Sequence, residues 1–195
     1  MTISRNSLMS LEAYAKVRNT MRAQVIEHKK KRCVHLGNHL TFLFEDETTI
    51  RYQVQEMLHI EKIFDEEGIA AELQAYLPLV PDGNNFKATM QIEYENESER
   101  RAALSRLIGI QDRVFLTIGS EAPIYAVADE DLDRENSEKT SAVHFLRFEL
   151  TDSAKHSIFT GVPLLLGCDH PHYPVAPRQI PAEVANALRA DLLQN

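Results

Sequence analysis

A carboxylate and an imidazole lie three residues apart at Glu56 and His59, within residues 53–61. Side chains at positions i and i+3 share one face of a helix, so this pair could hold a metal ion or share a proton. Ferritin-like di-iron sites need two Glu-x-x-His helices and two further carboxylates, and this sequence contains one such motif. A di-iron centre within one chain is therefore not expected, and a surface hydrogen bond between Glu56 and His59 is the simpler interpretation.

A second group of chemically active side chains follows a predicted strand. Cys168, His170 and His172 occupy alternate positions, and thiol and imidazole groups are good ligands for zinc or another borderline metal. Because zinc sites use three or four protein ligands, His59 or His144 would have to complete such a site.

The same segment also has a structural interpretation. Asp169 and His170 would then brace a proline-stiffened turn, with Tyr173 packed over the edge of the sheet. His144 shares a predicted strand face with apolar residues, which is typical of a hydrogen-bonded histidine in a core. The sequence leaves both interpretations of residues 168–173 open.

Familiar nucleotide and hydrolase motifs are absent. The sequence has no Gly-x-Gly-x-x-Gly, no Gly-Lys-Ser or Gly-Lys-Thr, and no Gly-x-Ser-x-Gly. No nucleotide cofactor is therefore expected. A Cys33 or Cys168 nucleophile with a histidine nearby in space stays open, so the sequence does not decide whether the protein is an enzyme.

Composition limits the class of protein. A chain of 195 residues with 44% hydrophobic content suits a single α+β domain spanning residues 1–195. The formal net charge of −8 argues against binding to nucleic acid or to a membrane surface. No apolar run reaches the length of a membrane span and no signal core is present, so we expect a cytoplasmic protein with two free thiols.

Hydrophobic periodicity predicts the elements of the first half of the chain. A long helix follows Ser10 to about residue 30, and a hairpin of residues 33–36 and 39–45 closes through Gly37 and Asn38, which would place His35 beside Leu40. A helix capped by Asp46 is expected to run to about residue 66, before a shorter helix at 69–76. Residues 87–95 then alternate as a half-buried strand with one polar side.

The second half is predicted with the same rules. Asn96 caps a helix that Gly109 ends, and strands follow at 113–118, 124–128 and 142–150 around an exposed acidic loop at 129–138. A short helix at 152–159 precedes a last strand at 162–167 and a proline-rich loop. Pro181 begins a C-terminal amphipathic helix.

Together these elements predict an α+β fold. We expect a mostly antiparallel sheet of about six or seven strands. A long N-terminal helix, a central Gln-x-Gln-Glu-Met helix and a C-terminal helix should pack against it.

Three segments in this order resemble a bacterial family known as a domain of unknown function: residues 39–45, 53–61 and 169–173. The resemblance spans nearly the whole chain, and its most specific part is the Gln-x-Gln-Glu-Met run. Gln55, Glu56, Asp169, His170 and Tyr173 match the family pattern and are expected to share a pocket. An Arg commonly stands where this chain has His59, and Cys168 and His172 are not part of the pattern, which weakens a metal role for these three.

Members of that family are often encoded near rubrerythrin-like and iron-sulfur oxidoreductase-like proteins, which implies a supporting role in redox or oxidative-stress physiology. The leading expectation is an accessory protein that binds such a partner through the polar face of the second helix and the acidic loop. The alternative is a protein or enzyme that binds zinc or iron around His170 and Glu56, with Cys168, His172 or His59 as further ligands. A homodimeric structural protein is the third possibility.

Overall fold

The computed structural model describes residues 3–128 and 138–193. Among these residues the helices longer than one turn are α1 (Leu11–Lys30), α2 (Glu47–Glu61), α3 (Glu66–Tyr76), α4 (Glu97–Arg106), α5 (Asp152–Phe159) and α6 (Ala182–Ala190). Short 3₁₀ turns lie at Arg5–Ser7, Leu77–Leu79 and Ile110–Arg113. No helix in this part of the chain is both long and apolar enough to cross a bilayer.

The strands form two antiparallel sheets. Sheet A has the order β1-β2-β3-β6, from Cys33–Leu36, Leu40–Phe44, Asn85–Ile92 and Val143–Glu149. Sheet B has the order β5-β4-β7-β8, from Ile124–Tyr125, Val114–Ile118, Leu164–His170 and Tyr173–Gln179. The α+β class and the antiparallel pairing are confirmed, and the described strands divide into two sheets of four rather than one sheet.

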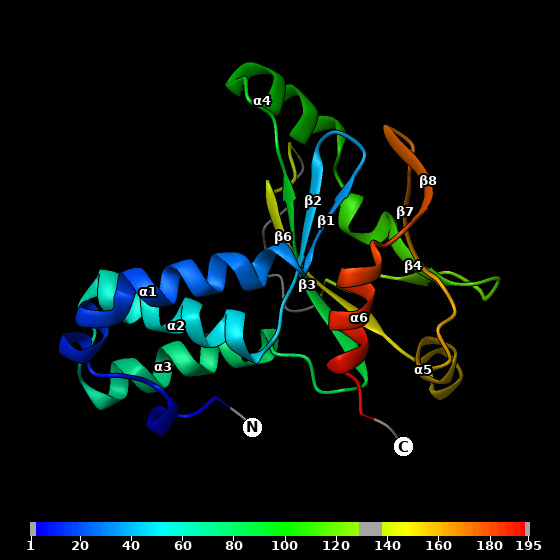
Figure 1. The fold of residues 1–195 in the computed structure, drawn as a ribbon. Coiled ribbons are helices and arrows are strands. Elements are labelled where there is room, and N and C mark those ends of the chain that lie inside the picture. The colour runs from blue at the N-terminus through cyan, green and yellow to red at the C-terminus, as the bar shows by residue number, and fades with distance from the viewer. Residues whose placement is uncertain (1–2, 129–137, 194–195) are drawn as a thin grey trace.

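The three N-terminal helices lie side by side and extend to one side of the sheets (Figure 1). The predicted caps are confirmed: the Ser10 hydroxyl accepts from the Ala13 N–H at 3.2 Å, and the Asp46 carboxylate accepts from the Thr49 N–H at 2.8 Å. The expected extension of α2 to residue 66 is wrong. Lys62 takes a left-handed conformation at φ 61° and ends α2, and Asp65 then caps α3.

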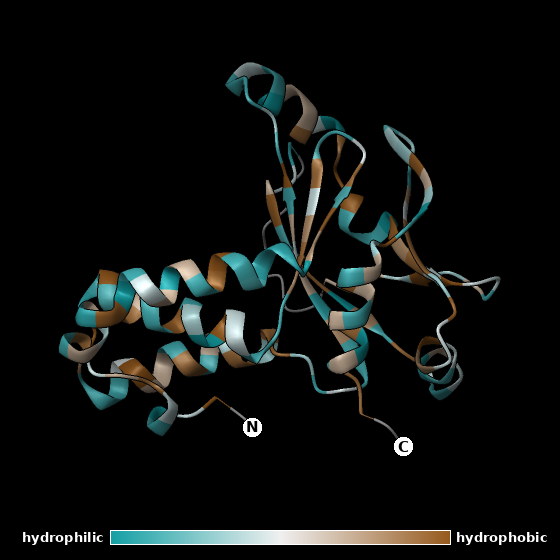
Figure 2. Ribbon diagram, in the orientation of Figure 1, coloured by the Kyte–Doolittle hydropathy of each residue, from teal (hydrophilic) through white to brown (hydrophobic). Residues whose placement is uncertain are grey.

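Two hydrophobic clusters stabilise this arrangement. One is shared by both sheets, α5, α6 and the end of α4. Along β3, hydrophobic and hydrophilic residues alternate (Figure 2). The other cluster joins α2 and α3 to the N-terminal segment through Ile50, Val54, Leu58 and Ile69. Phe145 of β6 packs against this second cluster, so the helical layer rests on the face of sheet A that points away from the shared core.

The β1–β2 turn differs from the prediction by one residue. Leu36 pairs with Leu40, and His35 lies opposite Thr41 rather than beside Leu40. The turn therefore contains Gly37, Asn38 and His39, and Gly37 has a φ of 67°, a left-handed value that favours glycine.

The end of sheet B also differs from the prediction. The last strand was expected to stop at residue 167 before a loop, but β7 continues to His170, turns at Pro171 and His172, and returns as β8. The proline-rich segment is thus a strand at the edge of the sheet. An edge strand tolerates Pro174 and Pro177 because its outward side needs no N–H donors.

The remaining predicted elements are present, with some different bounds: the strand expected at 124–128 is limited to Ile124–Tyr125, α4 ends at Arg106 rather than at Gly109, and β7 begins at Leu164 rather than at 162. Asn96 caps α4, α5 spans the expected residues, and α6 begins after Pro181. The predicted acidic loop falls mostly on residues 129–137, which lie outside the described residues, and Glu138 at its end is exposed.

Candidate functional site

Gln55 lies on α2, where it is buried and bonded to the N-terminal segment. Its Oε1 accepts from the Met9 N–H at 2.8 Å, and its Nε2 donates to the Met9 carbonyl at 3.2 Å. A primary amide can satisfy a peptide group in this paired way because it carries both a donor and an acceptor. Gln55 therefore fixes the segment that leads into α1.

Glu56 faces α1 and is bound there on both oxygens. Arg18 donates to Oε1 from Nε at 2.8 Å and to Oε2 from an Nη at 2.7 Å, and the Tyr14 hydroxyl also donates to Oε1. The hydrogen bonds from Arg18, and then the one from Tyr14, lower the pKa of Glu56 to about 2 despite its partial burial. Burial and the same carboxylate raise the pKa of Tyr14.

His59 shares the α2 face with Glu56, as its spacing predicts. Its ring meets the ring of Tyr14 edge-on with centroids 5.6 Å apart. Its Nδ1 is buried and has no hydrogen-bond partner among the described residues. The packing of α2 against α1 therefore leaves this ring nitrogen buried without a hydrogen bond to any described residue.

The segment 168–173 forms a hairpin, not a loop with free ligands. His170 is buried; its Nε2 lies 3.1 Å from the Ile108 carbonyl, and its Nδ1 accepts from the His172 N–H at 3.2 Å. These partners fit the neutral tautomer with the proton on Nε2. Asp169 is exposed and accepts from the Tyr125 hydroxyl at 2.7 Å.

Tyr173 joins this hairpin to the β1–β2 hairpin. Its hydroxyl donates to the Leu36 carbonyl at 3.0 Å and accepts from the His39 N–H at 2.9 Å. Tyr173 thus packs at the sheet edge, in agreement with the structural interpretation of this segment.

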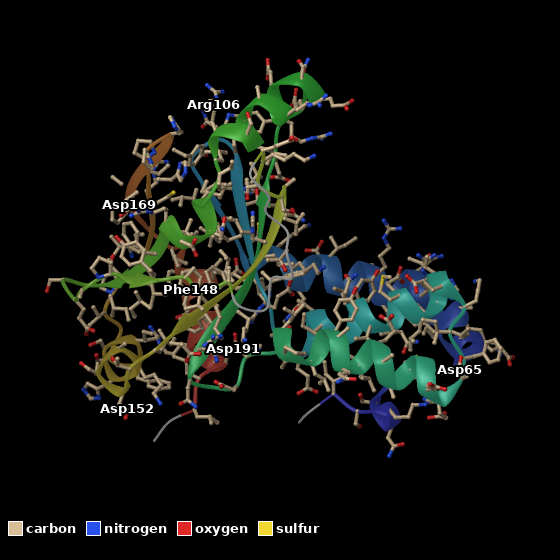
Figure 3. All side chains as sticks on the ribbon, turned by 180° about the vertical axis from the view of Figure 1, so that it is seen from behind. Asp65, Arg106, Phe148, Asp152, Asp169 and Asp191 are labelled. Carbon is tan, nitrogen blue, oxygen red and sulfur yellow. The ribbon has the colours of Figure 1, made fainter. Side chains whose placement is uncertain are left out.

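The structure does not bring the two halves of the expected pocket together. Gln55 and Glu56 bond to residues of the helical layer, whereas Asp169, His170 and Tyr173 belong to sheet B and its contacts. Figure 3 shows Asp169 on the opposite side of the molecule from Asp65 at the start of α3. The residues that match the family pattern therefore act as two separate structural clusters.

The candidate metal ligands are likewise dispersed. Cys168 is buried in the shared core, and burial raises its pKa to about 11, which disfavours the thiolate that binds metals. The rings of His170 and His172 lie 5.8 Å apart, but within residues 3–128 and 138–193 no three candidate ligands gather. A zinc or iron site around His170 and Glu56 stays a prediction, which elemental analysis of untagged protein would test.

His144 and His35 have different surroundings. His144 is buried, with its Nε2 2.9 Å from the Thr140 hydroxyl, so the expected hydrogen-bonded core histidine is confirmed. His35 is exposed, with its Nε2 4.0 Å from Cys33 Sγ and its Nδ1 3.0 Å from the Thr41 hydroxyl. Burial, and then the charge of Glu93, raise the pKa of the Cys33 thiol, so this pair lacks an activated nucleophile.

A more promising site lies on the face of sheet A that points away from the core, which we call the outer face. Strand alternation places Thr41, Leu43, Thr89, Gln91, Val143 and Phe145 on this face, opposite the buried residues of the same strands. The helical layer covers one end of the outer face and leaves the other end open. Two adjacent cavities result, and both are lined by Gln91 and Val143.

The more enclosed of the two cavities, called the closed cavity below, lies between the outer face and the helical layer and has a volume of about 200 Å³. Its one buried carboxylate is Glu45, which follows β2. The hydroxyls of Thr49 and Thr89 donate to its two oxygens at 2.5 and 2.6 Å. Leucine, isoleucine and aromatic side chains form much of the remaining wall.

The open groove has a volume of about 770 Å³ and lies at the far end of the outer face. The rings of His39 and Tyr94 stack there at 3.8 Å. Three exposed carboxylates line it together with one guanidinium: Glu93, Glu95, Glu99 and Arg100. This end of the molecule can therefore offer an anionic, partly aromatic surface to a cationic partner.

Sequence reasoning identified the polar side of residues 87–95 but did not select it as a site. The available signal was the alternation itself, because a strand with one core face normally exposes the other face to solvent. The helical layer covers part of this exposed side because the cluster of α2 and α3 packs against Phe145. This contact joins segments that are far apart in the sequence.

Comparisons with known proteins place the chain in a family without assigning an activity. A family model described as "Protein of unknown function (DUF3501)" matches residues 2–192. A crystal structure of a novel protein of unknown function from Burkholderia pseudomallei K96243 has 67% sequence identity and a TM-score of 0.94. The similarity covers 98% of this chain and 100% of that one. No curated protein matches the chain.

Proposed function

This chain belongs to the DUF3501 family of proteins of unknown function, and we propose that it is an accessory protein that binds a redox partner at the open groove of sheet A. The observation that carries the proposal is the cluster of three exposed carboxylates beside the stacked His39–Tyr94 pair. The polar face of α2, the contact surface expected from the sequence, is less suited to this role because Gln55 and Glu56 already bind Met9 and Arg18.

The chemistry of the groove favours a basic segment of another protein. Carboxylates attract lysine and arginine over distances of about 10 Å at moderate salt, and the net charge of −8 adds to this attraction. The stacked rings offer a flat surface for an arginine or an aliphatic chain. Rubrerythrin-like and iron-sulfur oxidoreductase-like proteins are the proposed partners, because the family resemblance links the chain to them.

The test measures binding of the purified chain to a rubrerythrin-like and to an iron-sulfur oxidoreductase-like protein of the same host by isothermal titration calorimetry. We expect one of them to bind, with an affinity that falls as salt rises. The triple variant Glu93→Gln, Glu95→Gln and Glu99→Gln should weaken binding at least about tenfold, because it removes three charges from the contact.

A matched control removes the same charge elsewhere. Glu12→Gln, Glu27→Gln and Glu183→Gln change exposed carboxylates outside the groove and should leave the affinity within about twofold. The proposal is wrong if neither partner binds, or if the groove variant and the control variant weaken binding equally.

A further inference from the structure

Glu45 is a buried carboxylate at the wall of the closed cavity, and only 8% of the residue is exposed. Its side chain accepts hydrogen bonds from two neutral hydroxyls, those of Thr49 and Thr89. No ion pair joins this carboxylate to a cation among the described residues. Burying an ionised carboxylate without a cation is costly, so this site has an unmet preference for positive charge.

Three basic side chains belong to the surroundings of Glu45. Buried Lys87 is its neighbour on β3, where the Lys87 carbonyl accepts from the Glu45 N–H at 2.8 Å, and within the part of the chain that the structure describes no ion pair joins the two side chains. The Arg32 guanidinium donates to the Phe44 carbonyl and to Asp191, and it lies 3.3 Å from Asp46. Lys29 also lines the cavity, but its Nζ lies over the ring of Tyr52 at 6.0 Å from the ring centroid, and Tyr52 is not a lining residue. None of these three cations forms an ion pair with Glu45 among the described residues.

The two threonine hydroxyls leave part of the carboxylate available. A carboxylate has about four acceptor positions, and Thr49 and Thr89 use two of them. Because both hydroxyls donate to Glu45, they also orient its oxygens in a fixed position. A ligand ammonium group could donate to the remaining positions with little reorganisation of the protein.

The rest of the cavity indicates the kind of cation. Its apolar and aromatic lining consists of Leu43, Ile50, Tyr76, Leu79, Val143 and Phe145. Such a wall suits the carbon chain of an organic cation. The polar lining residues Thr49, Thr89, Gln53 and Gln91 accompany a single carboxylate, which is fewer acidic groups than a calcium site usually uses. A volume of about 200 Å³ corresponds to about six or seven water volumes at about 30 Å³ each.

We infer that the closed cavity binds a small organic cation, with its ammonium group on Glu45 and a short aliphatic chain against the apolar wall. The site differs from the open groove in chemistry and in enclosure, so the inference does not depend on partner docking there. It assigns a ligand class, short aliphatic amines, to a cavity that the helical layer creates.

The first measurement uses the full chain and three probes of nearly the same shape at neutral pH: n-butylamine, 1-butanol and butyrate. We expect n-butylamine to bind in calorimetry and to raise the melting temperature with increasing concentration. Butanol should bind more weakly and butyrate should not bind. Equal responses to amine and alcohol, or a response to calcium chloride in place of the amine, would overturn the inference.

Variants then locate the binding. Glu45→Gln keeps the shape and the acceptor oxygen, and it should weaken n-butylamine binding at least about tenfold. Leu43→Trp, at a half-buried position that lines the closed cavity and not the open groove, should reduce binding by filling the cavity even if Glu45→Gln folds poorly. Glu93→Gln in the open groove serves as the matched control and should bind the amine as the unmodified chain does.

These outcomes separate the inference from the proposed function. Loss of amine binding in Glu45→Gln with unchanged partner binding supports two independent sites. If amine binding responds to Glu93→Gln and not to Glu45→Gln, the closed cavity is not the amine site.

Discussion

Glu56 has a side chain that could bind a metal or transfer a proton, but in this fold it holds two helices together. Its carboxylate receives two hydrogen bonds from Arg18 and one from Tyr14, all from α1. Such charge-assisted, bidentate pairs are stronger than neutral hydrogen bonds. Glu56 therefore links α2 to α1, and its oxygens are occupied by these hydrogen bonds rather than free to bind a metal or a substrate.

Replacing Glu56 with Gln should destabilise the fold by about 2 kcal/mol at neutral pH, because hydrogen bonds to a charged group are lost. The pH dependence has a defined sign. The pKa of Glu56 is lowered from 4.5 to about 2, so its contribution is present above pH 4.5 and is lost as the pH falls towards 2. Urea unfolding across this range measures both effects.

The matched control is Glu12→Gln. Glu12 pairs with Lys16 on the exposed side of α1, and such surface pairs contribute less than about 1 kcal/mol. If the two variants show the same stability and the same pH profile, Glu56 does not have the role that its contacts assign to it.

At the residue scale, the sequence identifies which side chains stand out but not which residues they contact in the fold. Gln55 and Glu56 stand out in the sequence, but Met9 and Arg18 lie 46 and 38 positions away from them. No local pattern predicts such contacts, because they depend on how two helices pack. The same holds for Tyr173, whose partners Leu36 and His39 lie on another hairpin.

At the scale of elements, two hairpins meet at Gly37 and Tyr173. A Cβ atom on Gly37 would lie 2.5 Å from the Tyr173 hydroxyl oxygen, and the φ of 67° adds conformational strain for any other residue. Gly37 is thus required both by its own turn and by the neighbouring hairpin.

A double-mutant cycle tests this junction. Tyr173→Phe should cost about 1 kcal/mol through its lost hydrogen bonds, and Gly37→Ala should cost more, about 3 kcal/mol, from strain and contact with the hydroxyl. The double variant should be more stable than the sum predicts, because Phe removes the atom that alanine approaches most closely. Strict additivity in urea unfolding would contradict the described junction.

The elements themselves were predictable where local chemistry decides them. Ser10, Asp46, Asn96 and Pro181 mark helix starts in the sequence, and the structure confirms each. The β8 strand was missed because most of its residues are exposed, so it lacks the apolar alternation that reveals half-buried strands. The end of α2 was misplaced because Lys62, not the glycine at 68, adopts the left-handed conformation.

At the scale of the whole molecule, the packing of the helical layer against sheet A creates the closed cavity. Sequence patterns predicted the layer and the sheet separately. They could not predict the cavity, because it depends on how Phe145 of β6 packs against the cluster that contains Ile50 rather than on either segment alone. The same limit applies to Glu45, which the sequence places only at the end of a strand.

Arg32 holds the helical layer, sheet A and the C-terminal segment together. Its buried guanidinium donates to the carbonyls of Phe44 and Glu45, and it pairs with Asp46 at the start of α2 and with Asp191 just after α6. Figure 3 shows Asp191 near the middle of the molecule. One cation thus serves anions from two distant parts of the chain.

Replacing Asp191 with Asn should destabilise the fold by about 2 kcal/mol. Breaking a buried ion pair costs about 3–5 kcal/mol when the other charge is left alone, but Arg32 retains Asp46 and two carbonyls. Asparagine keeps an acceptor oxygen, so the loss of stability measures the contribution of the negative charge of Asp191. Thermal unfolding measures the loss, and amide hydrogen exchange should show faster exchange in α6 than in α3.

Glu183→Gln is the control for this prediction, because Glu183 and Lys31 form an exposed pair at 3.8 Å between the same two regions. Its effect should stay below about 0.5 kcal/mol, since exposed ion pairs are screened by solvent. If both variants behave alike, the C-terminal segment is held by apolar packing of Leu188 and Leu192 and not by Arg32. If only Asp191→Asn is destabilised and α6 exchanges first, the buried ion pair between Arg32 and Asp191 holds the C-terminal segment against the rest of the fold.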